Sequence, residues 1–167
     1  MYIYRQLSPE QRADLVKQRR AKGYPPHSPP HPILGAEFYL ITAACYEHCH
    51  HINTPKRRQE LADRLFAMFA KQEIEIKAWV ILTNHYHFLV TTVDFKWLSQ
   101  EIRLIHGRLA REWNQETSKT GKIWCSYSDR AIRSEKHFYT AINYIHYNPV
   151  KHNHVKSPYE WEESSVH

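Results

Sequence analysis

The sequence predicts an α+β domain of ferredoxin-like type, with helices packed on a mostly antiparallel sheet behind a helical and Pro-rich N-terminal extension. Two observations lead to this expectation. First, the hydrophobic residues switch between the two-residue period of strands and the longer period of helices, in the order β-α-β-β-α-β-α. Second, five of the nine prolines stand between positions 24 and 32, which separates a basic helix and arm over 1–34 from a domain over 35–167.

Local patterns place each element along the chain. Ser8 followed by Pro9 is typical of a helix start, and we expect this helix to end near Arg20. Strands are predicted over 37–46, 74–83, 85–92 and 123–132, and helices over 54–71, 95–115 and 134–148. In the second strand, one face is expected to hold Ile74, Ile76, Ala78, Val80 and Leu82. Pro149 is expected to end the last helix.

Charge and cysteine content limit the class of protein. Lys and Arg number 23 against 17 Asp and Glu, for a formal net charge of +6, and this basic balance favours an anionic partner such as nucleic acid. Three cysteines argue against a disulfide framework. The sequence shows no signal-peptide pattern and no apolar run long enough to span a membrane. We therefore expect a cytoplasmic protein with no membrane partner.

Two histidines interrupt an apolar stretch, ILTNHYHFLV. On a strand, residues i and i+2 point the same way, so His85 and His87 would project from one face. Two neutral imidazoles suit a divalent cation, and a third ligand would leave positions open for a substrate. The alternative is a pair of polar residues on a solvated strand face.

The last predicted helix carries a tyrosine and an asparagine one turn apart. Tyr144 and Asn148 share a face, so a phenol and a carboxamide could approach one phosphate. A tyrosine is a feasible nucleophile at phosphorus when a nearby positive charge assists its ionisation. Tyr139 and Tyr147 are rival nucleophiles, and an amphipathic helix with tyrosines at its rim is the alternative to any chemistry.

Together the two motifs resemble the HUH endonuclease superfamily, and the segment 124–155, with YSDRAIRSEKHF and NYIHYNPVKHNHV, resembles the REP-associated tyrosine transposases. The resemblance implies a ferredoxin-like fold and a Mg or Mn ion held by His85, His87 and Asn148. It further implies that Tyr144 cleaves single-stranded DNA beside a hairpin and forms a 5′-phosphotyrosine link. A monomer is implied, because the dimeric members are the related insertion-sequence transposases.

Basic side chains are expected to form the DNA surface. They lie along the predicted helix over 95–115, at both ends of the tyrosine helix and in the N-terminal extension. They are Arg103, Arg108, Arg111, Arg130, Arg133, Lys136, Lys151, Arg19 and Arg20. We expect positive charge on both sides of Tyr144, and the extension to contact the hairpin stem or its 5′ flank. Trp124 and Tyr127 are candidates for stacking on unpaired bases, with core packing as the alternative for Trp124.

A third feature is the segment with Cys45, Cys49 and the histidines at 48, 50 and 51. It has the ligand types of a zinc site but no second pair of ligands, so a mobile loop near the substrate is the favoured interpretation. Three rival functions stay open on the sequence. They are a dimeric insertion-sequence transposase, a catalytically inactive hairpin-binding module and a zinc-dependent hydrolase that would not need Tyr144.

Overall fold

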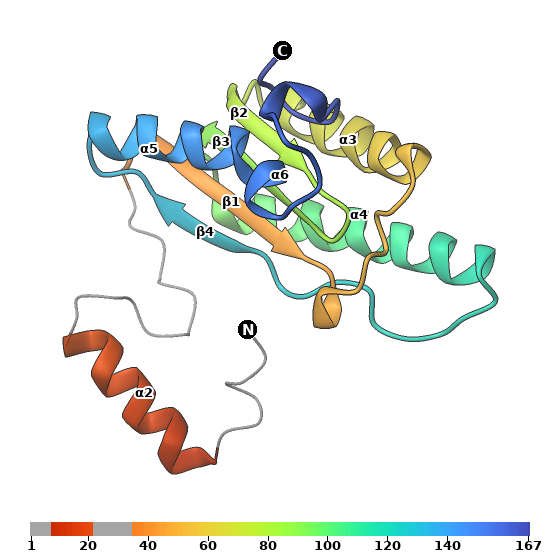
Figure 1. Ribbon diagram of the computed structural model, residues 1–167. Coiled ribbons are helices and arrows are strands. Elements are labelled where there is room, and N and C mark those ends of the chain that lie inside the picture. The colour runs from red at the N-terminus through yellow and green to blue at the C-terminus, as the bar shows by residue number, and fades with distance from the viewer. Residues whose placement is uncertain (1–7, 22–34) are drawn as a thin grey trace.

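The computed structural model describes residues 8–21 and 35–167 (Figure 1). Its elements are α2 (Pro9–Ala21), β1 (Phe38–Ala44), the 3-10 helix η1 (Tyr46–His48), α3 (Pro55–Ala70), β2 (Ile76–Ile81), β3 (His85–Thr91), α4 (Phe95–Glu116), β4 (Ser128–Ala131), α5 (Glu135–His146), α6 (Asn148–Lys151) and η2 (Pro158–Glu160). The predicted Pro-rich arm falls outside the described residues. None of the described helices is long and apolar enough to cross a membrane.

Helix α2 begins where the sequence predicts. The Ser8 hydroxyl accepts a hydrogen bond from the Gln11 backbone N–H at 3.3 Å, and the Gln11 side-chain oxygen accepts one from the Ser8 N–H at 2.9 Å. This reciprocal pair is a capping box, which satisfies N–H groups that have no partner inside the helix. Pro9 then occupies the first helical position, where its missing N–H costs nothing.

The four strands form one sheet in the order β2-β3-β1-β4, and every neighbouring pair is antiparallel. β1 and β2 are joined through α3 and separated in the sheet by β3, while α4 joins β3 to the edge strand β4. This is the split β-α-β arrangement of the ferredoxin-like fold. The predicted fold class is confirmed.

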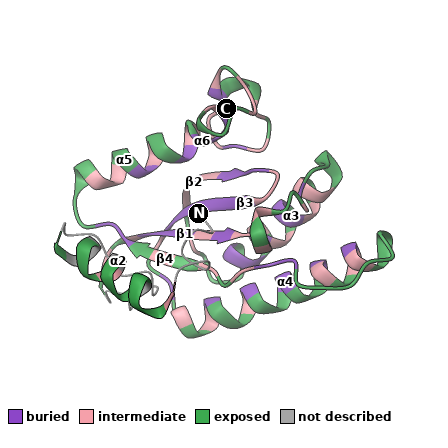
Figure 2. Cartoon of the chain, turned by 60° about the horizontal axis from the view of Figure 1, so that its bottom comes forward, coloured by how far each residue is buried: buried purple, intermediate pink, exposed green. Residues whose placement is uncertain are grey.

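Helices pack on both faces of the sheet. α3 and α4 lie on one side of it and α5 on the other (Figure 2). Tyr86, Phe88 and Val90 of β3 belong to the core under α3 and α4, whereas Leu89 packs with Ala141 and Ile145 of α5. Because strand side chains alternate, the odd-numbered residues of β3 all face α5, and this places His85 and His87 in that layer.

The face predicted for the second strand is wrong in one respect. The register of β2 against β3 shifts between Ile76 and Ala78. Ile74 and Ile76 pack on the core under α3, whereas Val80 and its alternating neighbours pack against α5. The cause is a β-bulge, whose extra residue reverses which face the following side chains occupy.

The predicted tyrosine helix is also shorter than expected. α5 ends at His146, and Asn148 begins the short helix α6. Pro149 stands at the start of α6, and the preceding helix ends two residues before the predicted end at Asn148. Proline has no N–H to donate to the preceding turn, so the helix breaks just before it while the chain keeps turning in the same sense. Asn148 therefore lies beyond the break, in its own helical turn.

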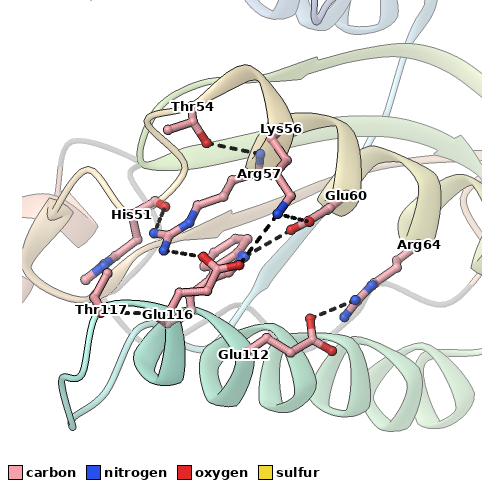
Figure 3. A network of polar contacts seen from close by, with 10 residues as sticks. His51, Thr54, Lys56, Arg57, Glu60, Arg64, Glu112, Glu116 and Thr117 are labelled. Carbon is pink, nitrogen blue, oxygen red and sulfur yellow. Dashed lines mark hydrogen bonds and ion pairs between the residues drawn. The ribbon is translucent and has the colours of Figure 1, made fainter.

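A network of polar contacts ties the start of α3 to the end of α4 (Figure 3). The Arg57 guanidinium donates to the His51 carbonyl oxygen and to Glu116, both at 2.9 Å, and it lies over the Trp113 ring at 5.1 Å. The Arg57 side chain is 11% exposed. Arg57 thereby holds the loop that runs from β1 to α3.

Replacement of Arg57 tests this role. Arg57→Leu leaves the His51 carbonyl without its donor and Glu116 with Lys56 as its remaining partner, and we expect the free energy of unfolding to fall by about 2–3 kcal/mol. Arg64→Leu is the matched control, because the Arg64–Glu112 pair joins the same two helices with side chains that are 33% and 44% exposed. The control substitution should lower the free energy of unfolding by less than about 1 kcal/mol. Equal losses in urea titrations would contradict a special role for Arg57.

Candidate active site

Four side chains meet between the sheet and the end of α5. His85 and His87 come from β3, Tyr144 from the last turn of α5, and Asn148 from the start of α6. The Asn148 Oδ1 atom lies 2.9 Å from His85 Nε2, and the Tyr144 hydroxyl lies 3.4 Å from His87 Nε2. The structure thus assembles the two histidines, the tyrosine and the asparagine that the sequence predicts as one site.

The protonation of the His85 ring is set by Asn84. The Asn84 amide nitrogen donates to the His48 carbonyl at 3.0 Å, so its amide oxygen faces His85 Nδ1 at 2.6 Å. That oxygen can only accept, and His85 Nδ1 must therefore carry the proton. The lone pair is then on Nε2, the atom that faces Asn148. Asn84 acts as the partner behind a ligand that fixes which nitrogen is free.

His87 has a similar partner on the neighbouring strand. Thr42 lies directly opposite His87 in the β1–β3 register, and its hydroxyl oxygen is 2.7 Å from His87 Nδ1. A hydroxyl accepts readily, so Nδ1–H donates to Thr42 when Nε2 is used as a ligand. Both free nitrogens then point to the space next to Asn148 and Tyr144.

Burial keeps both imidazoles uncharged. Desolvation lowers the pKa of His85 to about 4 and that of His87 to about 3, and neighbouring His152 acts in the same direction on both. At neutral pH both rings are therefore neutral bases with an available lone pair. A cation requires this state of a histidine ligand.

The residues present fit a divalent cation. Asn148 is fully buried, and its side-chain nitrogen has no hydrogen-bond partner among the described residues. Its oxygen faces the lone pair of His85 at 2.9 Å, and a cation bound by both atoms would stabilise this arrangement. Without a cation, rotation of the amide lets its nitrogen donate to His85 instead. Imidazole nitrogen and amide oxygen are both ligand types that Mg and Mn accept.

Tyr144 is distinguished from the rival tyrosines by its surroundings. Its side chain is 37% exposed, its ring lies 5.1 Å from the His87 ring, and Lys151 Nζ is 4.9 Å from its centroid. Tyr139 and Tyr147 are 57% and 58% exposed, and among the described contacts neither hydroxyl bonds to a histidine. Tyr144 is therefore the tyrosine that reaches both the histidine pair and solvent.

Comparison with known proteins identifies the family. No family model matches the sequence. A REP-associated tyrosine transposase of Escherichia coli (strain K12) is 30% identical over 131 residues, covering 70% of this chain and 73% of that relative. This chain belongs to the REP-associated tyrosine transposases. The family expected from the HYH and YIHYNPVKH motifs is confirmed.

A solved structure of a transposase has a similar fold. One, of a REP-associated tyrosine transposase bound to a REP hairpin, matches with a TM-score of 0.64 and 24% identity, over 82% of this chain and 81% of that one. A putative transposase from Deinococcus radiodurans matches with a TM-score of 0.45 and 17% identity, over 69% of this chain and 92% of that one. The first match shows that the ferredoxin-like arrangement described above is shared with a transposase of the same family.

The predicted DNA-contacting residues of this family member do not all flank the tyrosine. Arg103, Arg108 and Arg111 are exposed on α4, which covers the opposite face of the sheet from α5. The expectation of positive charge on both sides of Tyr144 is wrong for these three, because the sequence does not show which face a helix covers. Their role in binding DNA stays a prediction.

The remaining basic residues lie nearer to α5. Arg130 on β4, Arg133 in the loop before α5 and Lys136 in the first turn of α5 are all exposed. Lys136 is roughly 12 Å along the helix from Tyr144. Lys151 is the predicted residue that contacts the Tyr144 ring. Arg19 and Arg20 are in α2, but their side chains fall outside the described residues.

The cysteine segment does not form a metal centre. Among the described residues, no group of three or more His, Cys, Asp or Glu side chains could hold a metal ion. Burial raises the pKa of Cys45 to about 12, which disfavours the thiolate that zinc requires. What the segment supplies instead is the His48 carbonyl that orients Asn84. Glu47 and His48 both adopt left-handed backbone conformations, with φ of 54° and 51°, to present it.

Substitution of Asn84 tests the control of His85. Asn84→Ala removes the acceptor for Nδ1–H, and we expect Mn affinity to fall about 10- to 100-fold. Asn84→Asp keeps an acceptor oxygen but loses the donor to the His48 carbonyl, so its Mn affinity should fall less than that of Asn84→Ala. Nitrogen chemical shifts of the metal-free protein give an independent readout, with His85 protonated on Nδ1 in the parent and Asp variants and mixed in the Ala variant. Unchanged shifts and affinity in Asn84→Ala would rule out this role.

Buried histidines also make stability depend on pH. Desolvation lowers the pKa of His106 to about 3, and its Nε2 lies 3.1 Å from the Tyr86 hydroxyl. Below pH 6.5 the unfolded chain binds a proton that the folded chain refuses, so stability falls as pH decreases. His106→Gln keeps an acceptor but does not titrate. Between pH 7 and 5 in chelator, the parent should lose about 2 kcal/mol more than this variant. If the stability of the parent and of His106→Gln fell equally with pH, the pH dependence would not come from His106.

Proposed function

We propose that this transposase family member is a metal-dependent transesterase that cleaves single-stranded DNA beside a hairpin. The observation that carries the proposal is the approach of the Tyr144 hydroxyl to His87, next to the His85–Asn148 pair, in one half-open site. Family membership supports the reaction class, and the relative solved with a REP hairpin supports hairpin DNA as the substrate.

The proposed reaction exchanges one phosphate ester for another. The Tyr144 oxygen forms a bond to phosphorus while the bond from phosphorus to the 3′-oxygen breaks. The phenolic proton is lost to water and the departing 3′-oxygen takes up a proton, which leaves a 5′-phosphotyrosine link and a 3′-hydroxyl. Because the ester is kept in the link, a second 3′-hydroxyl reverses the reaction without ATP.

His85, His87 and Asn148 would hold the Mg or Mn ion. When bound, such an ion neutralises charge on the scissile phosphate and assists loss of the phenolic proton. The protein's own contribution is orientation, since Asn84 and Thr42 bind the outer ring nitrogens and turn the inner ones toward the substrate. Preorganised groups of this kind need no rearrangement during the reaction.

An open part of the sheet offers a path for the DNA. α5 packs mainly on β2 and β3, and the row across the sheet continues from His87 to Thr42 on β1 and Ser128 on β4. Ser128 and its neighbour Arg130 are exposed and lie on the same face as His87. A phosphate backbone that crosses this face meets Arg130 before the site and Lys151 beside Tyr144.

The site is built within one chain. Tyr144 reaches His87 of its own chain at 3.4 Å, so no second copy is needed to bring the nucleophile to the histidines. This geometry supports a monomer as the active form.

A labelled hairpin oligonucleotide with unpaired flanks tests the nucleophile. In Mn, the parent should form a covalent protein–DNA band, and Tyr144→Phe should form none while its affinity for the hairpin stays within about three-fold. Tyr147→Phe is the matched control and should keep the band. A band of full strength from Tyr144→Phe, or none from the parent, would contradict the mechanism.

The same assay separates a monomer from helix-exchanging dimers. An equimolar mixture of Tyr144→Phe and His87→Ala should give no covalent band, because neither chain holds a complete site. Recovery of the band in the mixture would show that one chain supplies the tyrosine to another.

A further inference from the structure

A cavity of about 540 Å³ lies between α4 and the segment 121–127, away from the proposed active site. Its wall includes Ile102, Gly107 and Ala110 of α4 and Trp124 of the segment. Arg103 and Lys122 also line it. The volume falls in the range of sites that take small organic groups.

The charge of this cavity sets it apart from the other two large ones. Two cations line it, and no Asp or Glu is among its described lining residues. The cavity at the start of α5 is lined by Glu37 and Glu135 as well as by arginine, and the one between α3 and α4 includes Glu101 and Glu112. The cavity beside Trp124 is therefore suited to an anionic group next to an apolar one.

The inner wall is rigid and aromatic. Trp124 stacks on His106 with ring centroids 4.0 Å apart and planes 6° from parallel. Trp124 is 6% exposed, and its indole N–H has no hydrogen-bond partner among the described residues. Because that nitrogen is buried, Trp124 contributes apolar surface to the cavity wall and not a hydrogen-bond donor. Tyr127, bonded to Ser99 at 2.8 Å, adds a second aromatic ring at the rim.

The cavity is linked to the strand that precedes the site. Cys125 N–H donates to the Ala44 carbonyl at 2.8 Å, and Tyr46 N–H donates to the Ile123 carbonyl at 2.6 Å. Ala44 lies directly opposite His85 in the β1–β3 register. The cavity wall and the proposed metal site are therefore attached to the same end of the sheet, on its opposite faces.

We propose that this cavity binds one unpaired nucleotide of the DNA strand that carries the scissile phosphate. The base lies in the cavity against Tyr127 and the apolar wall of α4, and Arg103 and Lys122 bind the adjoining phosphates. Aromatic walls with flanking cations are how proteins hold single-stranded nucleic acid. The inference rests on the proposed function, and it adds a second point of attachment on the far face of the sheet.

Gly107 allows the cavity to be filled with little disturbance. A Cβ atom added there meets nothing within 4 Å, and the residue is exposed within α4. Gly107→Leu therefore places a side chain in the cavity, and Gly107→Ala is the matched control with the same helix-stabilising change. We expect the affinity for a hairpin with unpaired flanks to fall about ten-fold for the Leu variant and less than two-fold for the Ala variant. A blunt hairpin without flanks should bind all three proteins equally.

Abasic scanning of the flank identifies the bound base. Removal of the base that enters the cavity should weaken binding by the parent and by Gly107→Ala. The same removal should have little effect on the affinity of Gly107→Leu, in which the cavity is already filled. The double variant Arg103→Gln, Lys122→Gln should reduce the salt dependence of binding by about 1.4 in log–log slope, as expected for two phosphate contacts. The salt dependence tests the inference even if Gly107→Leu folds poorly.

The outcomes separate this inference from the proposed function. Equal flank-dependent binding by the Leu and Ala variants, together with normal covalent-band formation, would overturn the cavity assignment alone. Loss of binding to flanked and blunt hairpins alike would also overturn it, because the effect would not follow the unpaired bases. A parent protein that binds no hairpin would overturn both.

Discussion

His85 and His87 project from β3 into the layer beneath α5, and the arrangement around them keeps two neutral imidazoles there. β3 is buried on both faces from His85 to Val90, so the rings have little access to water and remain uncharged at neutral pH. Hydrogen bonds to Asn84 and Thr42 then decide which nitrogens point inward. The positions of Tyr144 and Asn148 have meaning only relative to those two nitrogens.

The second half of the site depends on the break in the helix before Pro149. α5 holds Tyr144 at the rim, where its hydroxyl reaches both His87 and solvent, and α6 buries Asn148 completely against His85. The break thus places one functional residue at an exposed position on α5 and the other at a buried position on α6. The exposed position suits Tyr144 as a nucleophile that must meet a large substrate. The buried position suits Asn148 as a metal ligand that water should not displace.

Much of this could be predicted from local pattern alone. The fold order and the shared face of His85 and His87 follow from periodicity, which needs no knowledge of the partners. The role of Asn84 could not be predicted, because it resembles a turn residue and depends on the loop carrying His48, 36 positions earlier. The bulge at Ile76 and the face of the sheet that α4 covers could not be predicted either, since both are set by packing between distant segments. On the sequence, only the family resemblance distinguishes Tyr144 from Tyr139 and Tyr147 as the nucleophile. The structure adds the contact of Tyr144 with His87.

The central claim is that His85, His87 and Asn148 form one metal site beside Tyr144, and anomalous diffraction tests it most directly. Crystals grown with Mn should show a single strong anomalous peak bounded by the two Nε2 atoms and the Asn148 side-chain oxygen. The peak should disappear in crystals of His87→Ala. A peak near Cys49 and His50 instead, or none at the histidine pair at millimolar Mn, would contradict the account.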